Sequence, residues 1–138
     1  MKVIYETTAT ATGGRNGKVK SIDGVLDLQL AIPKDMGGAG GALTNPEQLF
    51  AAGYAACFDN ALAFVAAGQK IKLSGTRVDA TVGIGQRPEG GFGLAVRLDI
   101  TIPDVPREQA QALLEATDQV CPYSNAVRGN VKVDLVLA

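Results

Sequence analysis

A long Ala-rich apolar segment in the middle of the chain constrains the fold more than any other feature of the sequence. It opens with Asn45, which caps helix N-termini well, and Pro46, which suits the first helical position. Glu47 follows, where an acidic side chain favours the positive helix end, and Gly68 can end the helix. The sequence therefore predicts one long central helix over residues 46–67.

A helix of this length and apolarity raises the question of a membrane span. Asp59 and Asn60 lie at its centre, where burial in lipid costs several kcal/mol, and much of the segment is weakly hydrophobic Ala and Gly. We therefore expect no membrane association. A helix that is apolar nearly all round is better explained as the core of a soluble protein, which two subunits could share.

Strand signals occur in blocks on either side of this helix, and an α+β fold with antiparallel sheets is the fold class that such blocks favour. Glycine-rich turns separate three alternating segments before the helix, and a glycine-rich loop follows them. The expected order of elements is βββ-α-ββ-α-β, in a single domain over residues 1–138 without linkers or repeats. Strands are expected at 3–12, 18–22, 26–32, 73–84, 92–102 and 131–137. A second helix is expected at 106–120, and a short helix starts at Pro122.

Composition excludes several function classes. The 13 Lys and Arg residues nearly balance the 14 Asp and Glu residues without any basic cluster, so no electrostatic basis for nucleic-acid binding exists. The N-terminal residues lack the apolar run of a signal peptide, which makes a cytoplasmic location the expectation. A structural disulfide is not expected there, and two cysteines without histidine make a poor metal site. Thiol chemistry is thus the main reactive option.

Local physics separates the two cysteines. Cys57 lies within the long helix, beyond the useful reach of the helix dipole, and a free cysteine in such a position most simply packs as a small hydrophobe. A reactive thiolate there would need a separate cation. Cys121 precedes Pro122 at the expected helix start, where free N–H groups favour a thiolate, although it could also be a partly exposed cysteine without a role.

Two charged residues could assist a thiol. Arg15, in a glycine-rich turn, is either a solvated loop residue or a guanidinium that closes over an apolar pocket and stabilises a thiolate. Glu47 either complements the helix dipole or orients an arginine through a bidentate pair. Because Glu47 and Cys57 are ten residues apart, about 15 Å along one helix, a shared site would require Glu47 from a partner subunit.

Four aromatic residues lie close to the cysteines in the sequence. They are most simply core residues, but they could also line a pocket for an apolar substrate. They are Phe50, Tyr54, Phe58 and Tyr123.

The residues around both cysteines resemble a known family. The run at 45–58, together with Val-Cys-Pro-Tyr-Ser-Asn-Ala at 120–126, closely resembles the organic hydroperoxide resistance (Ohr) proteins of the Ohr/OsmC family. The turn at 14–17, the segment 21–24 and the glycine-rich loop before the helix resemble it too, so the match covers essentially the whole chain. The segment at 120–126 favours the Ohr branch over the OsmC branch.

This resemblance implies a thiol peroxidase that reduces organic hydroperoxides to alcohols. Cys57 matches the peroxidatic cysteine and Cys121 the resolving one, so the two would form a catalytic disulfide. Arg15 matches the arginine that activates thiolate and peroxide, and Glu47 the acid that pairs with it. The resemblance further implies an OsmC-like fold, an intertwined homodimer with two sites at its interface, no metal or haem, and reduction by dihydrolipoamide or a lipoylated protein.

Two alternatives from other classes stay open at this point. One is a non-enzymatic redox sensor, whose disulfide would alter binding to a partner. The other is a structural dimer module whose cysteines only pack.

Overall fold

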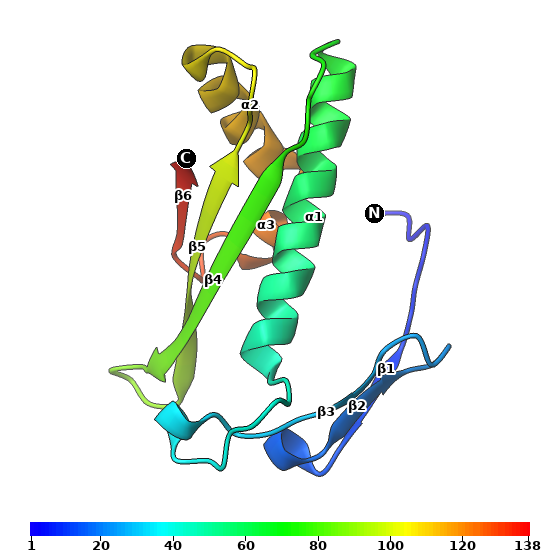
Figure 1. Cartoon of the computed structure of the whole chain (residues 1–138), viewed down its shortest axis with the longest axis vertical. Coiled ribbons are helices and arrows are strands. Elements are labelled where there is room, and N and C mark those ends of the chain that lie inside the picture. The colour runs from blue at the N-terminus through cyan, green and yellow to red at the C-terminus, as the bar shows by residue number, and fades with distance from the viewer. The chain divides into compact units, whose positions relative to one another are not determined.

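The computed structural model describes residues 1–138 and divides the chain into two compact units, Met1–Leu49 and Phe50–Ala138 (Figure 1). The helix α1 (Pro46–Gly68) starts in the first unit and continues into the second, so no linker separates them. The sequence shows no sign of this division, because the boundary falls inside a continuous helix.

The N-terminal unit is a small antiparallel meander, as predicted. Its strands are shorter than the alternating segments in the sequence, because pairing stops at the turns. Residues Gly14–Asn16 and Lys34–Met36 form short 3-10 turns, η1 and η2, the second within the segment expected to be an irregular loop. The strands, in the order β1-β2-β3, are β1 (Ala9–Thr12), β2 (Lys18–Ser21) and β3 (Asp27–Gln29).

Both ends of α1 are closed by local hydrogen bonds. At the start, Asn45 Oδ1 accepts a hydrogen bond of 2.8 Å from the N–H of Gln48, which confirms Asn45 as the N-cap. At the end, the N–H of Ile71 bonds to the carbonyl of Ala66 at 2.9 Å, and the N–H of Lys70 to the next carbonyl at 3.1 Å. This is a Schellman motif, and its left-handed position is taken by Lys70 (φ 57°) rather than by a glycine.

The C-terminal unit contains a three-stranded sheet formed by β4 (Arg77–Gln86), β5 (Phe92–Thr101) and β6 (Val133–Leu137). The hairpin β4–β5 is antiparallel, but β6 pairs parallel to β5, so the prediction of purely antiparallel sheets is wrong for this pair. The reason is the connection. The helices α2 (Arg107–Val120) and α3 (Pro122–Val127) carry the chain back to the end of the sheet where β5 starts, as a parallel crossover requires.

One face of α1 packs with the sheet and α2 into the core of this unit. Tyr54, Phe58 and Leu62 recur at helical spacing and are fully buried, and alternate residues of β5 meet them. The buried hydrophobic residues of this core are Tyr54, Phe58, Ala61, Leu62, Ala66, Val96, Leu98, Ile100, Ile102, Ala110, Leu113, Leu114, Cys121 and Val127.

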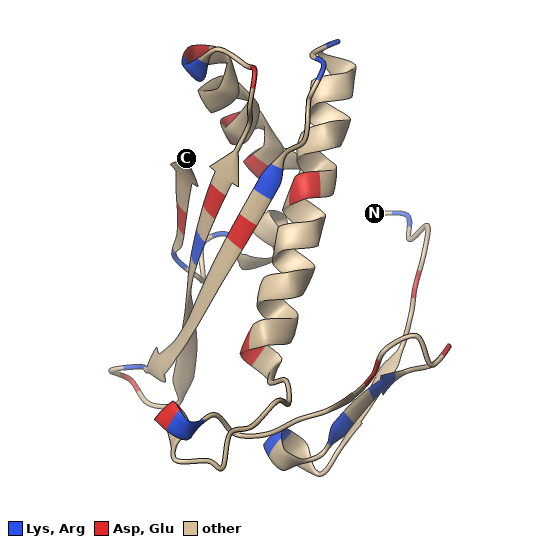
Figure 2. Cartoon of the chain, viewed as in Figure 1, with Lys and Arg blue, Asp and Glu red and all other residues tan.

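The opposite face of α1 is exposed in the single chain. It carries small or apolar side chains at helical spacing, Ala52, Ala56, Ala63 and Phe64, and it has almost no charge, unlike the strands β4 and β5 (Figure 2). By length and composition alone the helix could cross a membrane, and core helices of globular proteins have the same length and composition. Its central Asp59 accepts a 2.5 Å hydrogen bond from Thr76, and α1 serves as the core helix of its unit.

Candidate active site

The side chains of Cys57 and Cys121 face each other inside the C-terminal unit. Their sulfur atoms lie 3.7 Å apart, and both cysteines are free. Cys57 lies in the middle of α1, whereas Cys121 is both the C-cap of α2 and the N-cap of α3. Since a disulfide bond is about 2.05 Å long, a small shift of either segment would allow the two sulfurs to bond.

Burial distinguishes the two thiols in a way that the sequence did not indicate. Cys121 is fully buried, with 0% of its surface exposed, while Cys57 is partly exposed. The sequence alone made Cys121 the more accessible candidate, at a helix start. The tertiary structure reverses this order, because the turn between α2 and α3 packs its cysteine inward against α1. Only Cys57 can meet a reactant from solvent directly.

The surroundings of Cys57 do not activate it within this unit. Burial raises the pKa of the Cys57 thiol above its ordinary value, and the neighbouring Cys121 raises it further. The backbone N–H of Tyr123, in the first turn of α3, hydrogen-bonds to Cys57 and acts in the opposite direction. The helix-start amide that the sequence assigned to Cys121 therefore acts on Cys57. None of these groups is a cation, so a stable thiolate needs one from elsewhere.

Arg15 and Glu47 form a bidentate ion pair, one of the two roles left open for Glu47 and the pairing that the family resemblance implied. Within the N-terminal unit, the two guanidinium nitrogens of Arg15 donate to the two carboxylate oxygens of Glu47 at 2.8 and 2.6 Å. Side-chain exposure is 31% for Arg15 and 14% for Glu47, so the pair is shielded but open on the arginine side. These hydrogen bonds lower the pKa of Glu47 and raise the pKa of Arg15, which keeps both groups charged.

The turn that carries Arg15 is shaped by its neighbours. A Cβ atom at Gly17 would come within 1.8 Å of the carbonyl oxygen of Thr12, so only glycine fits where the turn closes. Asn16 accepts a hydrogen bond of 3.2 Å from the N–H of Ile32, which ties the turn to the segment after β3. The sequence indicated the turn but not this link, because it depends on the pairing of the meander. Arg15 is thus presented from a well-defined turn.

The aromatic residues near the cysteines divide into two kinds. Tyr54 and Phe58 are fully buried, so in this chain they offer no surface to a substrate. Phe50 and Tyr123 are more open, and the rings of Phe50, Tyr54 and Tyr123 contact each other with centroids 5.8 to 6.3 Å apart. Tyr123 lies over Gly53, where a Cβ atom would be 2.8 Å from its hydroxyl oxygen. An apolar wall beside Cys57 can therefore come from Phe50 and Tyr123, and their role as a pocket stays a prediction.

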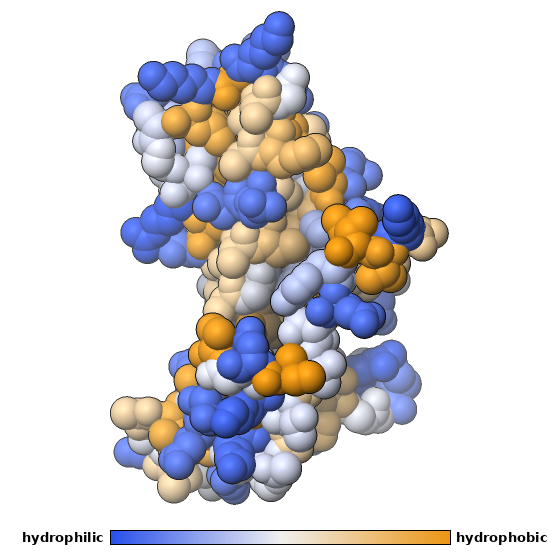
Figure 3. All heavy atoms as spheres, turned by 90° about the vertical axis from the view of Figure 1, so that its right-hand side faces the viewer, coloured by the Kyte–Doolittle hydropathy of each residue, from blue (hydrophilic) through white to orange (hydrophobic).

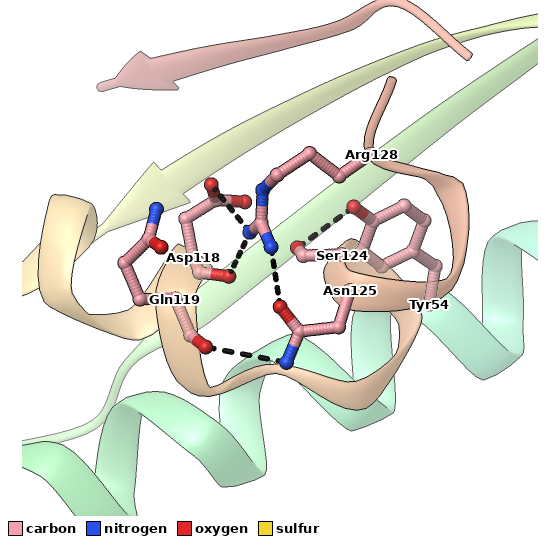
Figure 4. A network of polar contacts seen from close by, with 6 residues as sticks. All are labelled: Tyr54, Asp118, Gln119, Ser124, Asn125 and Arg128. Atoms are coloured by element: carbon pink, nitrogen blue, oxygen red, sulfur yellow. Dashed lines mark hydrogen bonds and ion pairs between the residues drawn. The ribbon is translucent and has the colours of Figure 1, made fainter. Parts of the chain in front are cut away.

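A polar network around the Cys121 turn was not predicted from the sequence (Figure 4). The hydroxyl groups of Tyr54 and Ser124 share a buried hydrogen bond of 2.8 Å between α1 and α3. Arg128 donates to the carbonyl oxygen of Asp118 at 2.7 Å and to its carboxylate at 3.1 Å. Arg128 also bonds the side chain of Asn125. Apart from the Arg128–Asn125 bond, which is local to α3, these bonds join residues on different helices, so no local pattern could reveal them.

Comparison with known proteins identifies the family. The model of the OsmC-like protein family matches residues 38–136. The chain is 56% identical to the organic hydroperoxide resistance protein of Xanthomonas axonopodis pv. citri over 138 residues, which cover 99% of this chain and 96% of that protein. The chain belongs to the Ohr proteins of the OsmC-like family. The resemblance inferred from the residues around the cysteines is thereby confirmed.

Solved Ohr structures confirm the fold class. A crystal structure of an organic hydroperoxide resistance protein from Elizabethkingia anophelis, with thiocyanate bound, matches with a TM-score of 0.96 and 56% identity, covering 100% of this chain and 99% of that one. The organic hydroperoxide resistance protein OhrB of Bacillus subtilis matches with a TM-score of 0.91 and 44% identity, over 99% and 100% of the two chains. This Ohr chain therefore has the α+β OsmC-like fold expected from its sequence.

Proposed function

We propose that this Ohr protein is a cysteine-based peroxidase that reduces organic hydroperoxides to alcohols. The observation that carries the proposal is the arrangement of its two thiols. Cys57 is partly exposed to solvent, and the sulfur of the fully buried Cys121 lies 3.7 Å from the Cys57 sulfur, where it can react with an oxidised Cys57 and with little else. The names of its relatives, which refer to organic hydroperoxide resistance, support the same substrate class.

The first step uses Cys57 as the nucleophile. Its thiolate attacks the distal oxygen of the peroxide, a sulfur–oxygen bond forms and the oxygen–oxygen bond breaks. The distal oxygen stays on sulfur as a sulfenic acid, and the alkoxide takes a proton from solvent to leave as the alcohol. The step needs a thiolate, which burial disfavours at Cys57.

Arg15 is the cation that we propose for this step. A guanidinium close to Cys57 would lower the pKa of the thiol and stabilise the charge that develops on the leaving oxygen. Glu47 would hold the guanidinium in place through its two hydrogen bonds, as it does within the N-terminal unit. Because Glu47 already fixes the orientation of the Arg15 guanidinium, less side-chain entropy is lost when Arg15 binds the thiolate and the peroxide.

A homodimer is part of the proposal. Glu47 and Cys57 are ten residues apart on α1, about 15 Å along the axis, so one straight helix does not bring the two side chains together. A second subunit could supply Arg15 and Glu47 to Cys57. Exposed apolar residues support such an assembly, among them Phe64 on α1 with 70% exposure and several residues of the N-terminal unit (Figure 3). Their burial between two copies would explain why they are apolar.

Reduction completes the cycle. Cys121 attacks the sulfenic sulfur to form a Cys57–Cys121 disulfide, and an external dithiol reopens it by thiol–disulfide exchange, becoming a disulfide itself. We propose dihydrolipoamide or a lipoylated protein as this reductant, with no metal or bound cofactor, in the cytoplasm. Apolar side chains such as Phe50 and Tyr123 would favour organic over hydrogen peroxide, since each buried methylene contributes about 0.8 kcal/mol.

Turnover measurements test the proposal. The purified protein is mixed with cumene hydroperoxide and dihydrolipoamide, and peroxide consumption is followed beside the Cys57→Ser variant. We expect many turnovers for the native protein and none for Cys57→Ser. Comparable consumption by both proteins would reject Cys57 as the nucleophile. A native protein that forms the disulfide once but does not turn over with any dithiol would instead favour the redox sensor.

A further inference from the structure

Among the contacts between α1 and the Cys121 turn, two are pairs of polar side chains that lie one helical turn apart. The first is the pair of thiols, and the second is the hydrogen bond of 2.8 Å between the hydroxyl groups of Tyr54 and Ser124. Tyr54 lies three residues before Cys57 on α1, and Ser124 lies three residues after Cys121. Residues at this spacing share a helix face, so the hydroxyl pair and the thiol pair connect the same two faces.

The Tyr54–Ser124 bond is completely enclosed. Tyr54 is 0% exposed and Ser124 is 2% exposed, and neither hydroxyl group has another side-chain partner. Burial of an unpaired hydroxyl is costly, so each group depends on the other. Displacement of the α3 start away from α1, which would separate the thiols, would therefore also break this bond. Figure 4 shows the tyrosine ring of α1 directed at Ser124 in the first turn of α3.

The segment that carries Cys121 is also held to α2. The last carbonyls of a helix lack partners within the helix, and two of those in α2 accept hydrogen bonds from side chains at α3. Arg128 donates to the carbonyl of Asp118 at 2.7 Å, and Asn125 donates to that of Gln119 at 3.2 Å (Figure 4). Cys121 lies within the segment of chain that both hydrogen bonds enclose. Ser124, in the same short helix, can therefore transmit the position of α1 to Cys121.

We infer that Tyr54 and Ser124 are positioning residues that keep Cys121 within reach of oxidised Cys57, an inference that rests on the proposed peroxidase function. In the resolving step, the Cys121 sulfur attacks the sulfenic sulfur of Cys57. A sulfur–sulfur bond forms, the sulfur–oxygen bond breaks, and the oxygen leaves as water with the proton of the Cys121 thiol. A second peroxide molecule competes for the same sulfenic acid, transferring one oxygen to give a sulfinic acid and an alcohol.

This competition provides a specific readout. The ratio of sulfinic acid to disulfide depends on how often Cys121 reaches Cys57, and it does not depend on how fast the sulfenic acid forms. A residue that only supports the core would change the stability of the protein without changing this ratio. A positioning residue changes the ratio in the folded protein, because it sets the distance between two reacting atoms.

The test uses Tyr54→Phe and Ser124→Ala, each of which removes one hydroxyl group. Reduced proteins are treated with increasing cumene hydroperoxide in the absence of a dithiol, and intact-mass spectrometry measures disulfide and sulfinic acid. Loss of an ordinary hydrogen bond should raise the sulfinic-to-disulfide ratio roughly fivefold in both variants. The double variant should be no worse than either single one, because both remove the same bond.

Thr117→Val is the matched control. Thr117 is also fully buried and lies four residues before Cys121, but its hydroxyl bonds the carbonyl of Leu113 in its own helix at 2.7 Å. The sulfinic-to-disulfide ratio of Thr117→Val should stay at the native value. Circular dichroism shows which variants fold. If Tyr54→Phe does not fold, Ser124→Ala alone still decides the test.

An unchanged ratio in folded Tyr54→Phe or Ser124→Ala would overturn the inference, and so would an equal rise in Thr117→Val. Failure of the proposed function looks different. In that case the native protein itself would form no disulfide when treated with cumene hydroperoxide.

Discussion

The sulfur of the fully buried Cys121 lies 3.7 Å from the sulfur of Cys57, and of these two thiols only that of Cys57 is reached by solvent. This relationship assigns different chemistry to two identical side chains. The partly exposed sulfur of Cys57 can meet a peroxide, and the buried sulfur of Cys121 can meet only its neighbour.

Replacement of the buried thiol should stop the cycle after one event. In Cys121→Ser, Cys57 still reacts with peroxide but has no partner to form a disulfide, so each chain should consume about one equivalent of cumene hydroperoxide to reach the sulfenic acid, and a second only on further oxidation to the sulfinic acid. Mass spectrometry should then find oxygen on Cys57. Normal turnover of Cys121→Ser with dihydrolipoamide would show that Cys121 is not required for resolution.

Removal of the guanidinium should leave Cys57 protonated at neutral pH. Burial raises the pKa of this thiol and no cation in its own unit opposes the effect, so the proposed contact with Arg15 is what would lower it. In Arg15→Ala, the pH profile of Cys57 alkylation, measured in the Cys121→Ser background, should move to higher pH. Peroxide reduction at pH 7 should slow by at least about tenfold, which corresponds to 1.4 kcal/mol.

Arg87→Ala is the control for this experiment. Arg87 also pairs with a glutamate, Glu89, in the glycine-rich connection between β4 and β5. Its removal takes away the same charge and a similar ion pair, and the alkylation profile of Cys57 should not move. Equal shifts in Arg15→Ala and Arg87→Ala would mean that net charge, rather than a contact with Arg15, sets the reactivity of Cys57.

Mixed dimers test whether Glu47 serves the partner's thiol. Cys57→Ser and Glu47→Ala subunits, unfolded and refolded together, should regain activity, because each heterodimer would contain one site with both native residues. Random pairing makes half of the dimers heterodimers, so about a quarter of the native sites should return. Separately refolded proteins, mixed afterwards, serve as the control. No recovery in verified heterodimers would indicate that Glu47 acts within its own subunit.

The end of α1 offers a stability prediction independent of function. Lys70 occupies the left-handed position of the Schellman motif with φ 57°, a conformation that is strained for side chains with a Cβ atom. Lys70→Gly should therefore raise the free energy of unfolding by about 1 kcal/mol, measured by urea denaturation. Lys72→Gly, outside the helix and without a positive φ, should not stabilise the protein. A destabilised Lys70→Gly would contradict this account of the helix end.

Local sequence patterns determined most of the secondary structure. The start of α1 depends on Asn45, Pro46 and Glu47, which are neighbours, so their capping role was readable and the structure confirms it. Alternation of apolar residues likewise predicted the strands. The direction of β6 was not readable, because alternation is the same in parallel and antiparallel pairs, and only the path of α2 and α3 decides it.

The candidate site was readable as a set of residues but not as an arrangement. Cys57, Cys121, Arg15 and Glu47 were identified through their resemblance to the family motif, which also implied that Arg15 and Glu47 pair. The burial of these side chains and the hydrogen bonds between distant segments could not be predicted from the sequence. Local reasoning made Cys121 the accessible thiol and gave no sign of the Tyr54–Ser124 bond. Side-chain burial depends on which helix covers which turn, and that is decided only when segments far apart in the chain pack together.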